Sequence, residues 1–577
     1  MKPMRCLLAA LVLLAMLAVA AGCGSKRSPA TAPSTSLSPY ARAMDNVVGN
    51  YAEYLGSGDV IVRGYGLVVG LGDKGAGKAP REVVQKIIAQ AKHYGLGQAN
   101  TNTEDITPER LIADRDTAAV VVSAELPPGT PKGAPIDAMV SALPGSPTIS
   151  LAGGSLFMTE LTRVQAEGGR LREGQPIATV KGEVFVNPFP GAADTSEATG
   201  QLQGRIIGGC TALEQRPIRL ALRHADYGLA QAIQDAINEK YPAVPHVAKA
   251  ISPQQIEIRI PQAFRGQHEH FLALVQHVYV PRNGMAQEYK ARQLADLIGQ
   301  PGAAYQDISL IWETMGRQVW PVVRPLYTDA SPSVAYFAAR AAMRQGDRQA
   351  LEVVIFAARD AGNPHRMMAI EELGRSTEMA ALDTLRGLLD ADETPVRVAA
   401  YEAIAAGGLA EGIQRISVDG GRFEIDIVPT RGKFLIYASQ ERRQRLALFG
   451  EGMQITHPIY FSAPDDVATV LAREGDESLC VFRRVGASRQ LSDPMRVGFD
   501  VKSLVTVLGT RPRKEKDGSY YGLGLTYSQV VGVLYRLCQE GSERRIPAEF
   551  ILQRSGQADR IYTGPEPISR PDTTSGQ

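Results

Sequence analysis

Four glycines interrupt an apolar run at residues 63–73, and they limit the backbone shapes open to this part of the chain. They are Gly64, Gly66, Gly70 and Gly72. Because glycine adopts backbone conformations that other residues avoid, the spacing favours a tight turn. Residues 67–69 predict a strand before the turn. A helical pattern follows as far as Gly95, with Val84, Ile87, Ile88 and Ala91 on one face.

Phosphate-binding loops have the same order of elements, so two chemical alternatives arise. Residues 70–75 fit G-x-G-x-x-G, and residues 72–78 fit G-x-x-x-x-G-K. A nucleoside triphosphate loop needs Ser or Thr after the lysine to bind magnesium, but Ala79 and then Pro80 follow here. A dinucleotide loop needs an acidic residue about 20 positions later, and Glu82 is too near. We therefore expect a packed turn, with a nucleotide-binding enzyme as the least favoured alternative.

The N-terminus predicts export from the cytoplasm. Lys2 and Arg5 precede an apolar run over residues 7–21, which is short for a membrane span and typical of a secretory signal. Residues 20–23, Ala-Ala-Gly-Cys, resemble a bacterial lipobox, although Ala replaces the usual Leu. This resemblance implies that Cys23 is lipidated; ordinary cleavage near Cys23 is the alternative.

A tether is expected after this signal. Gly24 follows Cys23 where Asp often marks inner-membrane retention, which favours the outer membrane. Residues 25–38 are rich in Ser, Pro, Thr and Ala and contain too little apolar surface to form a core. We expect a flexible tether over residues 24–45.

Length, charge and cysteine content restrict the number of domains, the partners and the chemistry of the remaining chain. A chain of 577 residues predicts three or four domains, and a formal charge of +1 gives no broad basic surface for nucleic acid. Three cysteines remain after the signal: Cys210 is expected as a small buried residue, whereas Cys480 and Cys538 could pair in an oxidising compartment. No Ser/His/Asp or Cys/His set suggests catalysis, and we expect no cofactor.

Several ordered blocks resemble flagellar P-ring proteins. The first is Gly-Tyr-Gly-Leu-Val-Val-Gly-Leu at residues 64–71. The others are residues 118–128, 136–142, 151–161 and the Gly-Arg-Ile of residues 204–206. The resemblance covers about residues 46–281. It implies a non-catalytic subunit of a periplasmic ring that supports the rod of the flagellar motor, with copies of itself, rod proteins, L-ring proteins and peptidoglycan as partners.

The same region has the residue pattern of a strand-rich α+β fold. Residues 118–124 and 136–140 are short β-rich runs joined through the turn at 126–129. The alternation of Ile256, Ile258 and Ile260 predicts a half-buried strand, and a helix carries Leu229, Ile233 and Ile237 on one face. His268 and His270 would share a strand face, but no third metal ligand is evident, so we expect a solvated loop and no metal site.

A helical repeat follows residue 281. Pro332, Pro364 and Pro395 recur at spacings of 32 and 31, each behind a capping residue: Ser331, Asn363 and Thr394. Equivalent apolar positions follow each proline, namely Ala338, Ile370 and Tyr401, then Ala341, Leu373 and Ile404. With intervening helices at 349–359 and 379–389, the pattern resembles HEAT-like repeats. A plain helical spacer is the alternative.

Strand signals return near Ile413. Phe423, Ile425 and Ile427 alternate with acidic residues, residues 429–432 predict a turn, and 433–437 predict a return strand. Ser528 is expected to cap a helix that carries Val530, Leu534 and Leu537. Arg442, Arg443 and Arg445 form a basic cluster for which a solvated face is the default.

The prediction is a multidomain α+β protein with a helical solenoid segment. Its expected parts are a signal at 1–23, the tether at 24–45, a P-ring-like domain at 46–285, HEAT-like repeats at 286–412, a C-terminal α+β domain at 413–555 and a disordered tail at 556–577. A lipid-anchored envelope scaffold outside motility is the alternative function. The expected location is the periplasm, tethered to the outer membrane.

Overall fold

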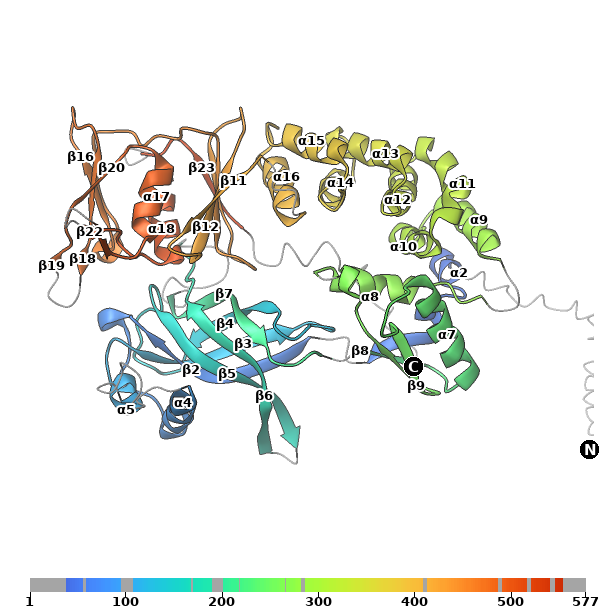
Figure 1. The fold of residues 1–577 in the computed structure, drawn as a ribbon, viewed down its shortest axis with the longest axis horizontal. Helices are drawn as coiled ribbons and strands as arrows, with labels where there is room; N and C mark the ends of the chain where they lie inside the picture. Colours follow the sequence, from blue (N-terminus) through green and yellow to red (C-terminus); the bar gives the residue numbers. More distant parts are fainter. Residues whose placement is uncertain are drawn as a thin grey trace, which may run out of the picture.

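The described residues form four packed units. The computed structural model describes residues 38–55, 59–94, 107–167, 170–188, 201–216, 218–264, 266–281, 286–407, 412–485, 490–515, 520–539 and 545–553. Figure 1 shows a barrel unit (residues 60–212) beneath a C-terminal unit (residues 413–553), and a four-stranded unit (residues 47–55 and 218–280) beneath a repeat segment (residues 286–407). None of the described helices has both the length and the apolar character needed to span a membrane.

Six antiparallel strands close the barrel unit in the order β2-β3-β4-β7-β6-β5. They are β2 Val60–Val69, β3 Ala118–Leu126, β4 Pro135–Ala142, β5 Ser155–Glu167, β6 Arg170–Glu183 and β7 Gln203–Ala212. Closure leaves no free strand edge, and alternate residues such as Val120, Val122 and Val140 fill the interior. The strands predicted at 118–124 and 136–140 are present as β3 and β4. Helices α4 (Arg81–His93) and α5 (Pro108–Ile112) pack on the outside.

The glycines of β2 allow this strand to lie close to β5. A Cβ atom on Gly64 would lie 2.2 Å from the backbone oxygen of Glu160, and one on Gly66 would lie 2.4 Å from Oγ1 of Thr159. Both distances are far below van der Waals contact. The pairing of β2 with β5 also shifts register between Arg63 and Val68. The Gly-Tyr-Gly motif is thus needed to close the barrel wall.

The four-stranded unit is an antiparallel sheet with helices on it. Its strand order is β1 (Ala52–Leu55), β8 (Ile218–Leu222), β10 (Gln255–Ile258), β9 (Ala248–Ser252). Helices α3 (Val48–Tyr51), α7 (Tyr227–Lys240) and α8 (His268–His277) contribute to its core. The predicted helix face of α7 is buried, as are Ile256 and Ile258, whereas Ile260 lies beyond the end of β10.

Paired helices build the repeat segment. They are α9 Gln287–Ile298, α10 Tyr305–Met315, α11 Trp320–Val323, α12 Pro332–Met343, α13 Arg348–Arg359, α14 Arg366–Leu373, α15 Met379–Leu388 and α16 Thr394–Ala406. The six apolar positions predicted from the proline spacing are at most 2% exposed. The two intervening helices, α13 and α15, also lie where the sequence places them. Stacking of neighbouring helices buries one continuous core.

Two of the predicted helix starts are wrong in detail. Thr394 is the first residue of α16, and Glu393 takes the cap position. Pro364 lies in a turn two residues before α14, where Asn363 Oδ1 accepts a hydrogen bond from the amide of His365 at 2.9 Å. Ser331 precedes α12 as expected, but its side chain makes no capping bond. Proline restricts the chain at each start, while the exact first residue depends on how the helices stack.

The C-terminal unit places helices α17 (Val501–Gly509) and α18 (Tyr527–Cys538) between two sheets, as Figure 1 shows. One sheet has the order β11-β12-β14-β13-β23, and the other has β15-β16-β17-β20. Strand bounds are β11 Gln414–Val418, β12 Phe423–Val428, β13 Leu435–Ala438, β14 Arg445–Phe449, β15 Ile459–Ser462, β16 Thr469–Ala472, β17 Leu479–Phe482, β20 Met495–Val497 and β23 Glu549–Leu552.

Two further expectations for this unit need correction. The predicted return strand exists as β13, but β14 lies between β12 and β13 and pairs in parallel with β12. The turn at 429–432 therefore begins a crossover and not a hairpin. The cap of α18 is Thr526, which forms a capping box with Gln529, while Ser528 lies inside the helix.

The expected tether reaches too far along the chain. Helix α2 (Pro39–Ala43) begins within it, and Ala43 and Met44 are buried against the repeat segment. Lys290 Nζ donates to the backbone oxygen of Arg42 at 3.0 Å. The signal, Cys23, Gly95 and the tail at 556–577 lie outside the described residues.

Candidate functional site

The glycine loop after β2 uses its amide groups internally. The amides of Gly70 and Gly72 donate to the carboxylate of Asp116, at 3.3 and 2.5 Å. The amides of Ala76 and Gly77 donate to the backbone oxygen of Thr117 at 2.9 and 3.3 Å. A phosphate loop aims such donors at its ligand, but here a protein carboxylate and a carbonyl already accept them.

The shape of this loop agrees with a packed turn. Gly70 and Gly72 have φ values of 81° and 63°, and Gly77 has 58°, so glycine supplies the left-handed conformations of the turn. A Cβ atom on Gly75 would lie 2.3 Å from the oxygen of Thr117. The backbone of residues 113–117 thus packs directly against the loop, while Lys78 is exposed to solvent.

The expectation of a solvated loop at His268 and His270 is wrong. Both residues lie on helix α8, and the His270 side chain is only 5% exposed. Its Nε2 atom lies 2.7 Å from Oε1 of Glu313 on α10. The alternation of the two histidines looked like part of a strand, but residues 270–275 supply an apolar helix face to the core of the four-stranded unit.

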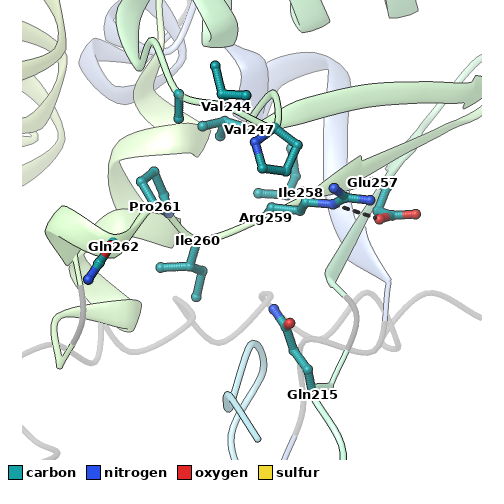
Figure 2. Close-up of a pocket in the computed structure, with 11 residues that line it drawn as sticks. Gln215, Val244, Val247, Glu257, Ile258, Arg259, Ile260, Pro261 and Gln262 are labelled. Carbon is teal, nitrogen blue, oxygen red and sulfur yellow. Dashed lines mark hydrogen bonds and ion pairs between the residues drawn. The ribbon is translucent and has the colours of Figure 1, made fainter.

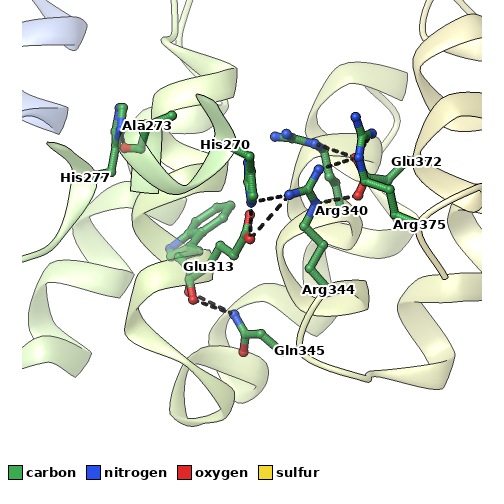
Figure 3. A network of polar contacts seen from close by, with 10 residues as sticks. His270, Ala273, His277, Glu313, Arg340, Arg344, Gln345, Glu372 and Arg375 are labelled. Carbon is green, nitrogen blue, oxygen red and sulfur yellow. Dashed lines mark hydrogen bonds and ion pairs between the residues drawn. The ribbon is translucent and has the colours of Figure 1, made fainter. Parts of the chain in front are cut away.

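Figure 3 shows that His270 belongs to a buried polar network, which we name the repeat junction: His270, Glu313, Arg340, Arg344 and Glu372. Arg344, which caps the C-terminus of α12, connects the two carboxylates, since it hydrogen-bonds to Glu372 on α14 and lies 3.5 Å from Glu313. Arg340 reaches Glu372 at 3.3 Å. The five side chains are at most 11% exposed. The network joins the four-stranded unit to the repeat segment.

The charges of this junction are matched. Burial by itself raises the pKa of Glu313, but Arg344 and His270 outweigh burial and hold this pKa below its usual value. Burial likewise acts to raise the pKa of Glu372, and Arg344 and Arg340 hold it far below normal. Burial lowers the pKa of His270, so the neutral ring is favoured. Two carboxylates thus face two guanidinium groups.

A second set of contacts, the barrel junction, joins the barrel unit to the C-terminal unit. Glu183 accepts a bond from Nε of Arg422 at 2.9 Å and one from the amide of Tyr527 at 3.4 Å, which places a carboxylate at the N-terminus of α18. Ser528 Oγ donates to the backbone oxygen of Val186 at 2.7 Å.

The barrel junction continues at Asp137 of β4. This carboxylate accepts bonds from the amides of Gly208 at 2.6 Å and Arg442 at 3.1 Å, and Arg205 pairs with Glu441 at 2.9 Å. The amide of Arg442 therefore faces the barrel, while Arg442 and Arg443 are exposed as expected. Arg445 is paired with Glu424 at 3.1 Å, so the expected solvated basic face is wrong for Arg445.

A third set, the sheet junction, joins the repeat segment to the C-terminal unit. Tyr401 of α16 donates to Asp426 Oδ2 of β12 at 2.8 Å, and Arg415 binds the same carboxylate at 2.8 and 3.0 Å. Asp426 is fully buried. The polar face of an alternating strand ordinarily contacts solvent, but α16 covers this face of the sheet.

An open groove lies where the barrel unit meets the four-stranded unit. Residues 243–245, Val247 and residues 257–262 line a cavity of about 500 Å³, and Figure 2 shows Gln215 on its opposite side. A neighbouring cavity of about 260 Å³ extends it toward Gly129 and Pro131 of the barrel unit. In the part of the chain that the structure describes, no group of three or more His, Cys, Asp or Glu residues has the arrangement of a metal site.

The cysteines have no bonding partners among themselves in the described residues. No disulfide joins Cys210, Cys480 or Cys538, so the pairing of the last two is absent here. Cys210 lies in the barrel core as expected, and burial raises the pKa of its thiol to about 12.

Sequence reasoning missed all three junctions, although one signal was available. Arg340 and Glu372 occupy the same position, eight residues after the repeat prolines Pro332 and Pro364. Charged residues of opposite sign at one buried position of adjacent repeats indicate a pair between repeats. Glu183 and Arg422 are 239 residues apart, and nothing in their local sequence connects them.

The family comparisons agree with this architecture. Residues 48–287 match the family model described as "Flagellar P-ring protein", and residues 321–405 match HEAT repeats. The Flagellar P-ring protein of Geobacter sulfurreducens is 30% identical over 243 residues, which cover 40% of this chain and 60% of the relative. That of Anaeromyxobacter dehalogenans is 28% identical over 368 residues, covering 60% of this chain and 91% of the relative.

The chain spans about 60% of the length of the Geobacter sulfurreducens relative. The Flagellar P-ring protein of Aquifex aeolicus, at 30% identity, is covered to 58%. The matched region contains the barrel unit and the four-stranded unit. Residues 48–287 of this chain are therefore similar to a region of flagellar P-ring proteins, and residues 321–405 are similar to HEAT repeats, with a C-terminal α+β unit following them.

Proposed function

We propose that the chain is a non-catalytic structural subunit of the flagellar basal-body P ring, or of a P-ring-like ring in the periplasm, that supports the rod during rotation. The observation that carries this proposal is the family match over residues 48–287. Its partners would be copies of itself, rod and L-ring proteins, and peptidoglycan. A closed ring needs head-to-tail contacts between copies.

Two features of the fold support a mechanical role. The signature glycines serve barrel closure, and the one loop that resembles a nucleotide site binds its own carboxylate. The appended units are joined to the P-ring region through buried junctions, which suits a part that must withstand torque.

Electron microscopy of purified basal bodies tests this proposal. With an epitope tag on the chain, we expect labelled rings around the rod, and deletion of the gene should abolish swimming and remove those rings. Intact rings in the deletion strain, with the tagged chain elsewhere in the envelope, would contradict the proposal and favour the alternative scaffold role.

The outer-membrane tether is a separate proposal. A lipid on Cys23 would hold the folded units near the membrane through residues 24–37. Cys23→Ser should then move the chain from the membrane fraction to the soluble periplasmic fraction. An unchanged distribution would argue against the anchor and would leave the ring proposal intact.

A further inference from the structure

The direct contact between the barrel unit and the four-stranded unit is small. The turn residue Gly129 lies against the side chains of Ile218 and Ile260. Arg216, in the segment that leads into β8, donates from its amide to Thr130 and from its guanidinium to Leu126. The groove of Figure 2 lies beside this contact.

These two units also have separate cores. Among the described residues, the buried cluster of the barrel interior contains barrel residues alone. The cluster under the four-stranded sheet contains residues of that unit alone. Units that share no large apolar interface are expected to move relative to each other. The direct contact by itself is thus suited to a hinge.

A longer route also connects the two units, through the repeat segment and the C-terminal unit, and it is continuously packed. One buried cluster runs from Val47 and Tyr279 of the four-stranded unit, through the repeat segment, to Phe449 in the first sheet of the C-terminal unit. A second cluster starts in the other face of that sheet and includes Phe185 and Ile207 of the barrel unit. The three polar junctions lie along the same route.

The four units therefore close a circuit in which the weakest link is the direct contact. We propose that residues 286–553 act as a brace, which fixes the angle between the barrel unit and the four-stranded unit across the groove. The brace holds at one end through the repeat junction and at the other through the barrel junction. This inference does not depend on the proposed ring function.

The most accessible place to release the brace is the ion pair of Glu183 with Arg422. Glu183→Lys would place two cations together at the barrel junction. The matched control is the charge swap Glu183→Lys/Arg422→Glu, which restores opposite charges. A second releasing variant, Ile207→Asp, places a charge in an apolar contact that is 7% exposed.

Distances between spin labels then report the angle. We would replace Cys6, Cys23 and Cys480 by Ser in the full chain; the buried Cys210 and Cys538 remain unlabelled. Labels at Ile61 and Ile251, which are 50% and 48% exposed, report the two units. A pair at Ile61 and Met139 reports barrel integrity, and a pair at Ile61 and Tyr460 reports opening of the barrel junction.

We expect a narrow Ile61–Ile251 distance distribution in the parent chain. Each releasing variant should broaden it by about twofold or more, as for units freed to move, while the Ile61–Met139 distribution stays unchanged. The charge swap should restore the narrow distribution. If the barrel junction opens and the Ile61–Ile251 distribution stays narrow, the brace proposal is wrong. It is also wrong if the parent distribution is broad, or if neither variant opens the junction.

Discussion

Gly64 and Gly66 lie on β2 where it passes close to β5, and the absence of a side chain is what permits this approach. Gly70, Gly72 and Gly77 serve a different purpose, because their positive φ values form the turn that follows. At the scale of single residues, the P-ring signature therefore describes how a strand enters and leaves a closed barrel.

Gly64→Ala should destabilise the barrel, because the new Cβ atom would lie 2.2 Å from a backbone oxygen that cannot move aside alone. We expect a loss of about 1–3 kcal/mol in the free energy of unfolding, measured by urea denaturation. The matched control is Gly299→Ala, where φ is −79° and no atom lies within 4 Å. The control should change stability by less than about 1 kcal/mol. Equal effects would disprove the close-approach argument.

The glycine loop should not bind nucleotide, because its amides already donate to Asp116 and Thr117. Equilibrium dialysis with labelled ATP should give no binding at micromolar concentration, for the parent chain and for Lys78→Ala alike. Binding that Lys78→Ala abolishes would show that the loop can rearrange around phosphate.

At the scale of elements, helices α8, α10, α12 and α14 meet around the repeat junction. Each helix contributes a charged or titratable side chain, and the partner of that side chain lies on another helix. The charged groups that act on His270 are Glu313, Arg344 and Arg340, and Lys240 acts on Glu313. The junction is therefore sensitive both to charge removal and to acid.

Acid should weaken this junction first through His270. Its pKa is lowered by burial, so the folded state binds fewer protons than the unfolded state once the pH falls through the ordinary value of 6.5. The contribution of His270 to the free energy of unfolding is then fully present above that pH. It declines below that pH, by up to about 1.4 kcal/mol for each unit of difference between the folded-state and unfolded-state pKa values. Glu313 and Glu372 have lowered pKa values, so their contribution declines only below their ordinary value of 4.5.

The measurement is the free energy of unfolding between pH 7.5 and 5.5. His270→Gln keeps a group able to bond Glu313 but removes the titration, so its stability should depend less on pH in this window. The exposed His224 provides the control, and His224→Gln should keep the parent pH dependence. A parent chain that is equally stable at both pH values would refute this role of His270.

Arg344→Met should lower the free energy of unfolding more than replacement of a surface arginine does. The substitution leaves the buried carboxylates of Glu313 and Glu372 without one of their cations. We expect a loss of about 3–5 kcal/mol in a thermal or urea titration. Arg292 on α9 is 70% exposed and pairs with Glu288, so Arg292→Met should lower stability by less than about 1 kcal/mol. Similar losses in the two variants would mean that the junction contributes little.

At the scale of the whole molecule, the sheet junction makes the repeat segment and the C-terminal unit one body. The five-stranded sheet is covered by the repeat segment on one face and by α17 and α18 on the other. The solenoid thus ends against a sheet, which replaces the capping repeat that such folds need.

Tyr401→Phe tests this coupling, because it removes a donor to the buried carboxylate of Asp426. We expect a loss of about 1–2 kcal/mol in the free energy of unfolding. Trp312 and Trp320 are the only tryptophans, so their fluorescence reports the repeat segment, while labelling of Cys538 mapped by mass spectrometry reports the C-terminal unit. The unfolding midpoints reported by tryptophan fluorescence and by Cys538 labelling should fall together. The exposed Tyr289 gives the control, Tyr289→Phe, and a shift in one probe alone would contradict the coupling.

The sequence by itself determined the local elements and the resemblance of the first half to flagellar P-ring proteins. Strand alternation, the helix face of α7, the 31- to 32-residue spacing of the repeat prolines and the glycine signature are all local patterns, because each follows from the period of one element or from the φ value of one residue. The same local rules misplaced His270, whose partner Glu313 comes from the repeat segment, and Arg445, whose partner Glu424 lies on a neighbouring strand.

Only the tertiary structure decided the order of strands β12, β14 and β13, the three junctions and the closed circuit of units. The pairs Glu183–Arg422 and Tyr401–Asp426 join residues that are 239 and 25 positions apart, and their partners become neighbours only after the units dock. Burial and charge pairing at such sites depend on which faces meet, and a periodic pattern indicates that a face is apolar without indicating what covers it.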